Sequence, residues 1–273
     1  MSEISASLKA ACISGNLSEA KSHYNEFAST RPSAKASTLS QMAVLSAKNS
    51  HPPILTFCFS EGLTMNPSLV NDPLVYAACD AGSIAVFEVL LEHGMDVNTY
   101  LEMNGSPLVS ACYAGNIELA KALLDHGADP NCGYPLGHYE ALIWTIVGPR
   151  ASLELVKLLL IRGMTVKGTG SLIAAAEHGN LEALRLLIEH ESKNGVCDLG
   201  EVEEYGEEDS RKLDDQGTPL YKAAAQGHSQ VVDFLLEKGA DPKFRDRKGR
   251  SVLDIAVENG HEDIAKRIRD GGA

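Results

Sequence analysis

The spacing of apolar positions within residues 104–131, NGSPLVSACYAGNIELAKALLDHGADPN, predicts two short helices joined by a tight turn. Ser106 and Pro107 form a helix start, because serine caps free backbone N–H groups and proline has none to satisfy. Gly115 supplies the positive φ that ends the first helix. A second apolar series then follows at helical spacing: Ile117, Leu119, Ala120, Leu123 and Leu124. Helices this short do not persist alone, so their apolar faces must be buried against similar units.

The same unit recurs along the chain with a period of about 33 residues. An apolar landmark residue lies seven positions before each turn, at Leu8, Met42, Val75, Leu108, Leu142, Leu172, Leu220 and Leu253. The turn position holds glycine in six copies, whereas copy two has Asn49 and copy five has Pro149. These two copies lack the residue that a left-handed turn favours. In copy two, the adjacent Pro52 and Pro53 are expected to start the second helix late.

The motifs that accompany this period resemble those of the ankyrin-repeat family. They are TPL at 218–220, GH at 227–228 and 260–261, and GAD at 127–129 and 239–241. The family's histidine after TPL is replaced by Val109 in copy four and by Tyr221 in copy seven. The resemblance implies an all-α ankyrin-repeat solenoid of about eight helix-turn-helix repeats with short hairpin fingers. It also implies a function in protein–protein interaction.

The repeats are predicted to form a single domain with one insertion. The copies lie near residues 1–34, 38–66, 70–99, 103–131, 138–166, 168–190, 214–243 and 247–273. The step of 48 residues from Leu172 to Leu220 exceeds the period and predicts an inserted acidic loop over 191–213. Residues 189–215 contain eleven acids and three bases, which is −8 of the chain's net charge of −13. Such a segment cannot collapse on itself, so we expect an exposed loop.

A basic finger follows this acidic loop, and two arrangements of the pair are open. The loop either floats in solvent or folds over the finger, whose basic residues are Lys243, Arg245, Arg247, Lys248 and Arg250. Individual surface ion pairs contribute little free energy, which favours the floating loop.

Net charge and hydropathy bear on the class of partner. A net charge of −13 disfavours nucleic acid, which would repel the chain at long range. The sequence has no apolar run that would span a membrane and no apolar core of a signal peptide. We therefore expect a monomer in the cytoplasm or nucleus whose partner is another protein.

The cysteines are predicted to be structural and reduced. Cys12, Cys79 and Cys112 occupy one repeat position, four residues after the landmark, where a small buried residue is required. Cys132 and Cys197 fall in loops. The chain has no CxxC pair and no short Cys/His cluster, and its recurring histidines are too far apart to share one ion, so no metal is predicted.

No motif for catalysis is evident. The sequence lacks a GxSxG elbow, a phosphate-binding loop and HExxH, and GTGSL at 168–172 is only a weak glycine cluster at a helix start. We predict that the chain is not an enzyme, has no catalytic residues and uses no cofactor.

Candidate binding residues come from the first helices and fingers, which line the groove in this architecture. Aromatic residues are 5% of the chain, and those in the groove fall in copies three to five. Tyrosine and tryptophan concentrate binding energy because they offer large rigid surfaces. The predicted partner-binding residues are Tyr100, Met103, Tyr113, Tyr134, His138, Tyr139, Trp144, Glu177 and His178.

The function predicted from these residues is that of a protein-binding scaffold or adaptor. One alternative is an enzyme or small-molecule site in the groove, around Tyr113, Trp144 and His178. Another is a regulatory inhibitor that uses the acidic loop as a lid. A structural alternative also exists for Trp144, whose ring would fill a gap between irregular repeats.

Overall fold

The computed structural model is an all-helical repeat structure and describes residues 4–65, 72–102, 104–132, 141–195, 197–202 and 216–271. Within these ranges the only extended pairing is in the fingers, as the isolated antiparallel bridges Leu101–Gly105 and Arg245–Ser251. The all-α prediction is confirmed. No helix in the described ranges combines the length and the apolar character that crossing a membrane requires.

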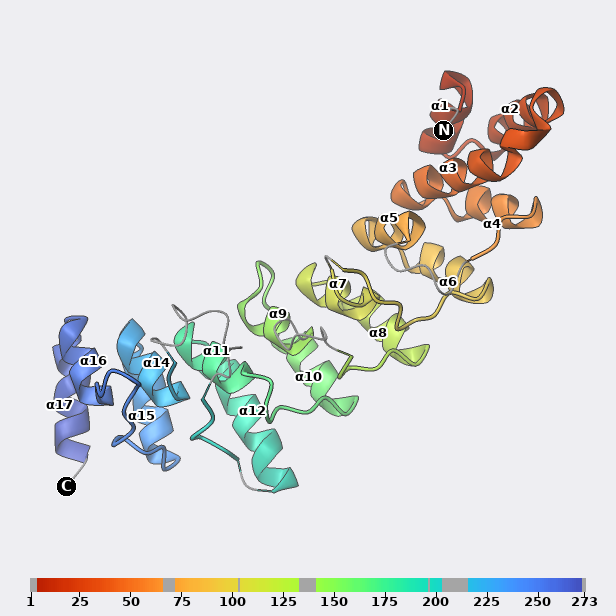
Figure 1. Ribbon diagram of the computed structural model, residues 1–273. Helices are drawn as coiled ribbons and strands as arrows, with labels where there is room; N and C mark the ends of the chain where they lie inside the picture. The colour runs from red at the N-terminus through yellow and green to blue at the C-terminus, as the bar shows by residue number, and fades with distance from the viewer. Residues whose placement is uncertain are drawn as a thin grey trace. The chain divides into compact units, whose positions relative to one another are not determined.

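The chain divides into two compact units, of which the first is Met1–Tyr134. Its first helices pack side by side in one row and its second helices pack in another (Figure 1). A short 3-10 helix, η1 (Pro32–Ala34), joins α2 to α3. The first helices are α1 (Ala6–Ser14), α3 (Lys35–Lys48), α5 (Pro73–Ala81) and α7 (Pro107–Tyr113). The second helices are α2 (Leu17–Thr30), α4 (Pro52–Ser60), α6 (Ile84–Glu92) and α8 (Ile117–Asp125).

The second unit, Pro135–Ala273, repeats this arrangement. Its first helices are α9 (Ala141–Val147), α11 (Ser171–Glu177), α14 (Pro219–Gln226) and α16 (Val252–Glu258). Its second helices are α10 (Leu153–Ile161), α12 (Leu181–Asn194), α15 (Ser229–Glu237) and α17 (Glu262–Gly271). The helix pairs of the two units together match the predicted number of about eight repeats.

The helix boundaries of copy four arise from the residues that predicted them. Ser106 Oγ accepts a hydrogen bond from the backbone N–H of Val109 at 3.4 Å, which caps α7. Gly115 has φ of 64°, so the chain reverses there. Asn116 Oδ1 then accepts from the N–H of Leu119 at 3.1 Å and caps α8. Such caps satisfy N–H groups that have no partner within the helix.

The landmark residues form the core. In copies one to seven each of them is at most 1% exposed, whereas Leu253 in copy eight is half-buried. Within each unit, the hydrophobic effect therefore acts at the junctions between neighbouring repeats, which is what stabilises helices of seven to fourteen residues.

The predicted structural cysteines are buried. Cys12 and Cys112 are 0% exposed and Cys79 is 9% exposed, while Cys132 and Cys197 are half-buried, and all are free thiols. Burial disfavours the thiolate and raises the pKa of Cys12 to about 11 and those of Cys79 and Cys112 to about 12. The prediction that these three cysteines pack in the core is confirmed.

A recurring hydrogen bond joins neighbouring repeats. The residue that precedes a second helix donates from its side chain to a backbone carbonyl at the end of the preceding repeat's first helix. The pairs are His51 Nε2 to Ile13 O (2.8 Å), Asn116 Nδ2 to Gly82 O (3.0 Å), Asn180 Nδ2 to Ile146 O (3.2 Å), His228 Nε2 to Glu177 O (2.9 Å) and His261 Nε2 to Ala225 O (3.2 Å). Three histidines therefore link neighbouring repeats through their side chains.

Turn glycines make room for these imidazole rings. A Cβ atom at Gly179 would lie 2.7 Å from Nδ1 of His228, and one at Gly227 would lie 2.5 Å from Cε1 of His261. Both glycines have positive φ, 67° and 83°. Glycine is needed at these positions for its left-handed backbone and also for the space that the next repeat occupies.

Copies two and five turn without glycine at the expected position. In copy two, Asn49 has φ of −102° and the positive φ moves one residue onward, to Ser50 at 59°. The second helix, α4, then begins at Pro52, three positions after the turn rather than two, so the late start is confirmed. In copy five, Pro149 fixes a negative φ, and the backbone N–H of Ser152 instead bonds to the carbonyl of Thr145 at 2.8 Å.

Two helices are longer than predicted. The acidic loop was expected from residue 191, but α12 continues to Asn194, and Ser192 Oγ bonds to the carbonyl of Ile188 at 2.7 Å. Glutamate and lysine favour helices, so α12 outlasts the buried stripe that starts it. Similarly, α3 begins at Lys35 rather than near 38. Residues 203–215, which include the last 11 residues of the predicted loop, lie outside the described residues.

Candidate partner-binding surface

The predicted binding residues are divided between the two units. Tyr100, in the finger before α7, and Tyr113, on α7, belong to the first unit. Trp144 on α9 and Glu177 and His178 at the end of α11 belong to the second. The remaining members of the set lie outside the described residues: Met103, Tyr134, His138 and Tyr139. Each unit therefore presents its own surface.

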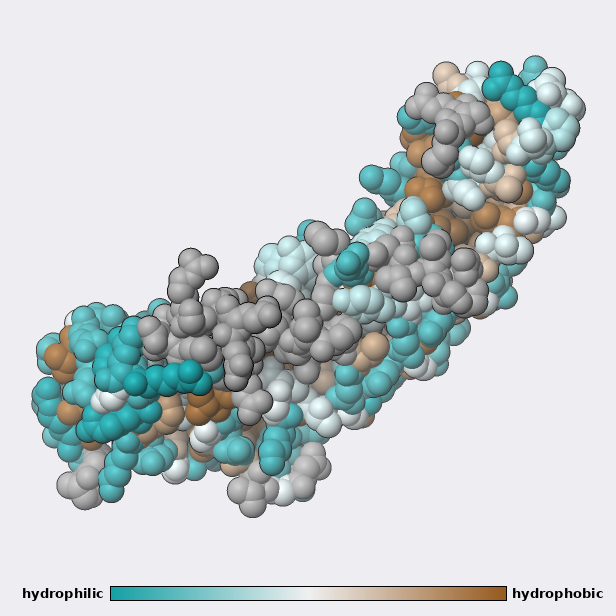
Figure 2. Space-filling view, in the orientation of Figure 1, coloured by the Kyte–Doolittle hydropathy of each residue, from teal (hydrophilic) through white to brown (hydrophobic). Residues whose placement is uncertain are grey.

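One repeat position dominates the surface of the first unit, namely the fifth residue after each landmark. It holds Ile13 on α1, which is 44% exposed, and Tyr113 on α7, which is 48% exposed. Asp80 on α5 is also exposed, whereas Ala47 on α3 is fully buried. Since neighbouring first helices pack together, these exposed side chains line one face, and apolar surface is visible along α1 and α3 in Figure 2.

The finger before α7 borders this face. Tyr100 is half-buried and Glu102 is exposed. The antiparallel bridge between Leu101 and Gly105 closes the hairpin that precedes α7. The surface of the first unit therefore combines an aromatic ring, an aliphatic side chain and two carboxylates. This combination suits a partner that offers apolar and positively charged groups.

An ion pair lies between the first helices of copies six and seven. Lys222 on α14 is 8% exposed, and its Nζ lies 3.3 Å from Oε1 of Glu177 on α11. The backbone carbonyl of Glu177 also accepts the hydrogen bond from His228. Glu177 thus links two repeats. Lys222 was absent from the predicted set, and the signal for it was a lysine in a position that is small or apolar in most other copies.

The other two predicted residues of the second unit differ in exposure. His178 is exposed, and its Nδ1 lies 3.0 Å from the carbonyl of Ala174 on the same helix. Trp144 is half-buried, so part of its ring is accessible and part packs against the protein. Ile13 in the first unit was not among the predicted residues. Its signal was an aliphatic side chain at a groove position.

The glycine cluster at 168–172 binds a carboxylate from its own chain. The backbone N–H of Gly170, which precedes α11, donates to Oε1 of Glu201 at 3.2 Å. Burial raises the pKa of Glu201, and the hydrogen bond from Gly170 offsets part of that rise. Glu201, near the middle of the predicted loop over 191–213, is therefore held at the start of α11 rather than floating in solvent.

The basic finger is partly neutralised by its own residues. Asp246 is 8% exposed, and its Oδ2 accepts hydrogen bonds from Tyr221 Oη and Arg250 Nε, both at 2.7 Å. Burial alone would raise the pKa of Asp246, but these hydrogen bonds outweigh burial and hold the pKa below its usual value. Lys243 and Arg247 are exposed on the same finger.

The fold and these surfaces define a stack of helix pairs with fingers, and comparison with known families agrees. A family model described as ankyrin repeats (3 copies) matches residues 42–133, 143–246 and 199–273. The chain belongs to the ankyrin-repeat family.

Individual relatives match over short segments. The chain is 31% identical over 97 residues to a probable E3 ubiquitin-protein ligase, XBOS32, of Oryza sativa subsp. japonica, which is 36% of this chain and 17% of the relative. It is 29% identical over 139 residues to the ankyrin repeat and KH domain-containing protein mask-1 of Caenorhabditis elegans, 44% of this chain and 5% of the relative. It is 30% identical over 96 residues to the potassium channel AKT1 of Arabidopsis thaliana, 35% of this chain and 10% of the relative.

These matches cover between 5% and 17% of the length of each relative, and the relatives are proteins of different kinds. Ankyrin repeats are generally protein–protein interaction modules, and the repeats are what the matched segments share with this chain. Within the described residues, no cluster of three or more His, Cys, Asp or Glu side chains could hold a metal ion.

Proposed function

We propose that this chain is a binding module for another protein, and that the first helices and fingers form the contact surface. The observation that carries the proposal is Tyr113, a large aromatic residue that is 48% exposed on a first helix whose other apolar side chains are buried. Ile13 is 44% exposed at the same repeat position. An exposed aromatic side chain on a first helix favours recognition, because a partner gains free energy by covering it.

The alternative of an enzyme site around Tyr113, Trp144 and His178 has less support. His178 is exposed and bonded to its own helix, whereas a catalytic histidine is held by a second group in a sheltered site. The free cysteines fit a reducing compartment, so the proposed location is the cytoplasm or nucleus.

The test compares two variants with wild type in affinity purification followed by quantitative mass spectrometry. Tyr113→Ala removes the exposed ring from the proposed surface. Ile161→Ala is the matched control, because Ile161 is 80% exposed but lies at the end of α10, a second helix. A genuine partner should be recovered by wild type and by Ile161→Ala and should be depleted with Tyr113→Ala.

The recovered partner is then purified and its dissociation constant is measured for each variant. Loss of a central aromatic contact should weaken binding by about tenfold or more, which corresponds to about 1.4 kcal/mol. Unchanged affinity for Tyr113→Ala and for an Ile13→Ser/Tyr113→Ala double variant would refute the proposed surface. Circular dichroism establishes that each variant is folded.

A further inference from the structure

The junctions inside the stack show what one repeat presents to the next. The landmark of copy seven, Leu220, and the residue four positions later, Ala224, are 0% exposed, because α16 of copy eight packs over them. The turn glycine, Gly227, lies against the imidazole of His261, and the carbonyl of Ala225 accepts a hydrogen bond from that ring. On the side that faces the next repeat, a repeat therefore presents an apolar face, a turn glycine without a side chain and a backbone carbonyl that accepts a hydrogen bond.

The outer face of copy eight has the same features and nothing over them in the described residues. Leu253 is half-buried and Val257 is 41% exposed, at the positions of Leu220 and Ala224. A Cβ atom at Gly260 would meet nothing within 4 Å. Glu258 occupies the position of Ala225, so its backbone carbonyl is the equivalent acceptor.

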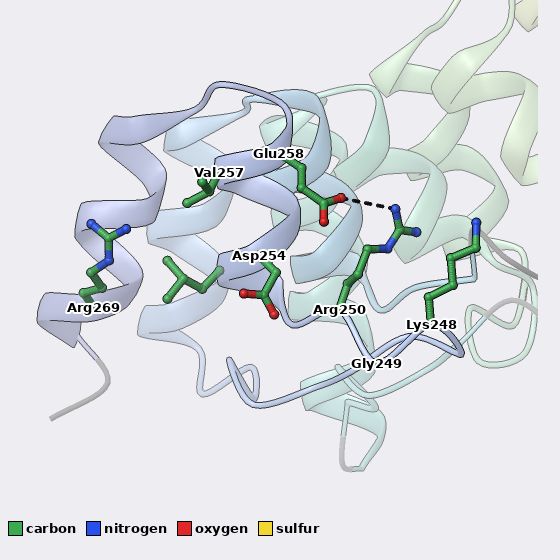
Figure 3. Close-up of a pocket in the computed structure, with 8 residues that line it drawn as sticks. Lys248, Gly249, Arg250, Asp254, Val257, Glu258 and Arg269 are labelled. Atoms are coloured by element: carbon green, nitrogen blue, oxygen red, sulfur yellow. Dashed lines mark hydrogen bonds and ion pairs between the residues drawn. The ribbon is translucent and has the colours of Figure 1, made fainter.

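An open pocket of about 510 Å³ marks this face. Figure 3 shows Val257 on α16 between Arg269 of α17 on one side and the paired Arg250 and Glu258 on the other. The guanidinium of Arg250 lies 3.4 Å from Oε2 of Glu258. Apolar surface is also visible at this end of the second unit in Figure 2.

The outer face of copy one carries the complementary features. Asn16 Oδ1 caps α2 by accepting from the N–H of Glu19 at 3.2 Å. Asn116 and Asn180 cap α8 and α12 in the same way, and both use Nδ2 to donate to the preceding repeat. Asn16 is exposed, and no repeat precedes copy one in the described residues. The side chain of Asn16 is therefore at the repeat position from which Asn116 and Asn180 donate to the preceding repeat.

The first helix of copy one also fits over an apolar face. The residues of α16 that pack toward copy seven include Val252 and Ile255, which are 0% and 7% exposed. The equivalent residues of α1 are Ser7 and Ala10, which are exposed and small. Small side chains at these positions let α1 approach Leu253 and Val257 closely.

One pair of second-helix positions can be followed across this contact. Inside the stack, two positions on neighbouring second helices contact each other: the sixth residue after the turn position of one repeat and the seventh residue after the turn position of the next. Arg185 and Phe234 are one such pair, with a cation–π distance of 4.4 Å. Asp233 and Arg267 are another, and they form an ion pair. Continued beyond copy eight, this rule brings Lys266 to Ser22 of copy one. A serine hydroxyl accepts from an ammonium group without repulsion.

We propose that the outer face of copy eight binds copy one of a second copy of this chain, so that molecules associate head to tail. Asn16 Nδ2 of one molecule donates to a backbone carbonyl at the end of α16 in its neighbour, and α1 covers Leu253 and Val257. The two faces differ, so the contact is heterologous and each molecule keeps one face of each kind free to extend the assembly. This contact uses the end faces of α1 and α16, so it adjoins the proposed binding face, and the expected monomer is its dilute state.

The test is sedimentation velocity of the full chain from about 1 µM to about 1 mM, the range in which one small interface is populated. The average mass of wild type should rise above the monomer mass of 29.2 kDa as concentration increases. Val257→Arg removes the copy-eight face and Ala10→Arg removes the copy-one face, so each variant alone should stay monomeric. An equimolar mixture of the two should form a dimer and nothing larger, because each variant retains one functional face.

Two further variants make the outcome decisive. Asn16→Asp keeps the cap of α2 but removes the Nδ2 donor, and should weaken association about tenfold without affecting folding. Ile161→Arg introduces the same charge on an equally accessible aliphatic residue elsewhere and should associate like wild type. Wild type that stays monomeric at every concentration would overturn the proposal. So would a mixture of the two face variants that fails to dimerise, since that outcome indicates a symmetric contact or none.

Discussion

Replacement of Gly179 by alanine should destabilise the second unit through two separable effects. Gly179 has φ of 67°, and an L-residue in that conformation costs about 1–2 kcal/mol. Its new Cβ would also lie 2.7 Å from Nδ1 of His228, so the ring must move and lose its 2.9 Å hydrogen bond to the carbonyl of Glu177. That loss adds about 1 kcal/mol, for a total of about 2–3 kcal/mol.

Gly163→Ala is the matched control because it has the first effect without the second. Gly163 has φ of 90° in the same unit, and a Cβ there meets nothing within 4 Å. Any stabilisation that alanine gains by restricting the unfolded chain is common to both variants and cancels in their comparison. Urea unfolding followed by circular dichroism should show Gly179→Ala to be about 1 kcal/mol less stable than Gly163→Ala.

A double-mutant cycle separates the two effects. In a His228→Ala background the ring is absent, so Gly179→Ala should cost no more than Gly163→Ala. Equal destabilisation by the two glycine variants in the wild-type background would refute the reasoning, since it would mean that the imidazole adapts freely. The same result would weaken the claim that the turn glycines are needed for packing between repeats.

Three further outcomes follow from the described contacts. Thiol reagents should modify Cys132 and Cys197 before the four buried cysteines, and mass spectrometry of the folded protein would measure the order of modification. Fast modification of Cys112 would contradict its burial. Tyr221→Phe removes the 2.7 Å hydrogen bond to Asp246 and should lower the free energy of unfolding, measured in urea, by about 1–2 kcal/mol. An unchanged free energy of unfolding would mean that Arg250 alone satisfies the carboxylate. The depressed pKa of Asp246 contributes stability above its usual pKa of about 4, and this contribution is lost as pH falls through the folded pKa. Asp246→Asn should therefore flatten the decline of stability below about pH 4, and an unchanged acid profile would argue against this role.

The fold was predictable because its signals are local and repeated. Each copy carries its own cap, apolar stripe and turn residue within about 33 residues, so each helix pair can be read from its own segment. Copy two marks a limit of such reasoning. Asparagine tolerates a left-handed backbone better than serine does, yet the positive φ lies at Ser50 rather than Asn49. Placing the turn there is consistent with the late helix start and lets His51 reach the carbonyl of Ile13.

The candidate surface was less predictable because it depends on contacts between distant segments. Glu177 was recognised as a groove residue, but its pairing with Lys222 spans 45 positions and one insertion. The docking of Glu201 on Gly170 spans 31 positions and has no repeat to predict it. Periodicity identifies equivalent positions, but it does not predict that Ile13 and Tyr113 are exposed while Ala47, at the same repeat position, is buried.

Hydrogen exchange of the chain with and without its purified partner tests the binding surface most directly. If the first helices and fingers form the contact, then peptides covering α7 and the finger before it should exchange more slowly in the complex. Peptides from the second helices α8 and α10 should exchange at the same rate in both states, because those helices lie on the other side of each repeat. Protection confined to α8 and α10, with α7 and its finger unchanged, would contradict the proposed function.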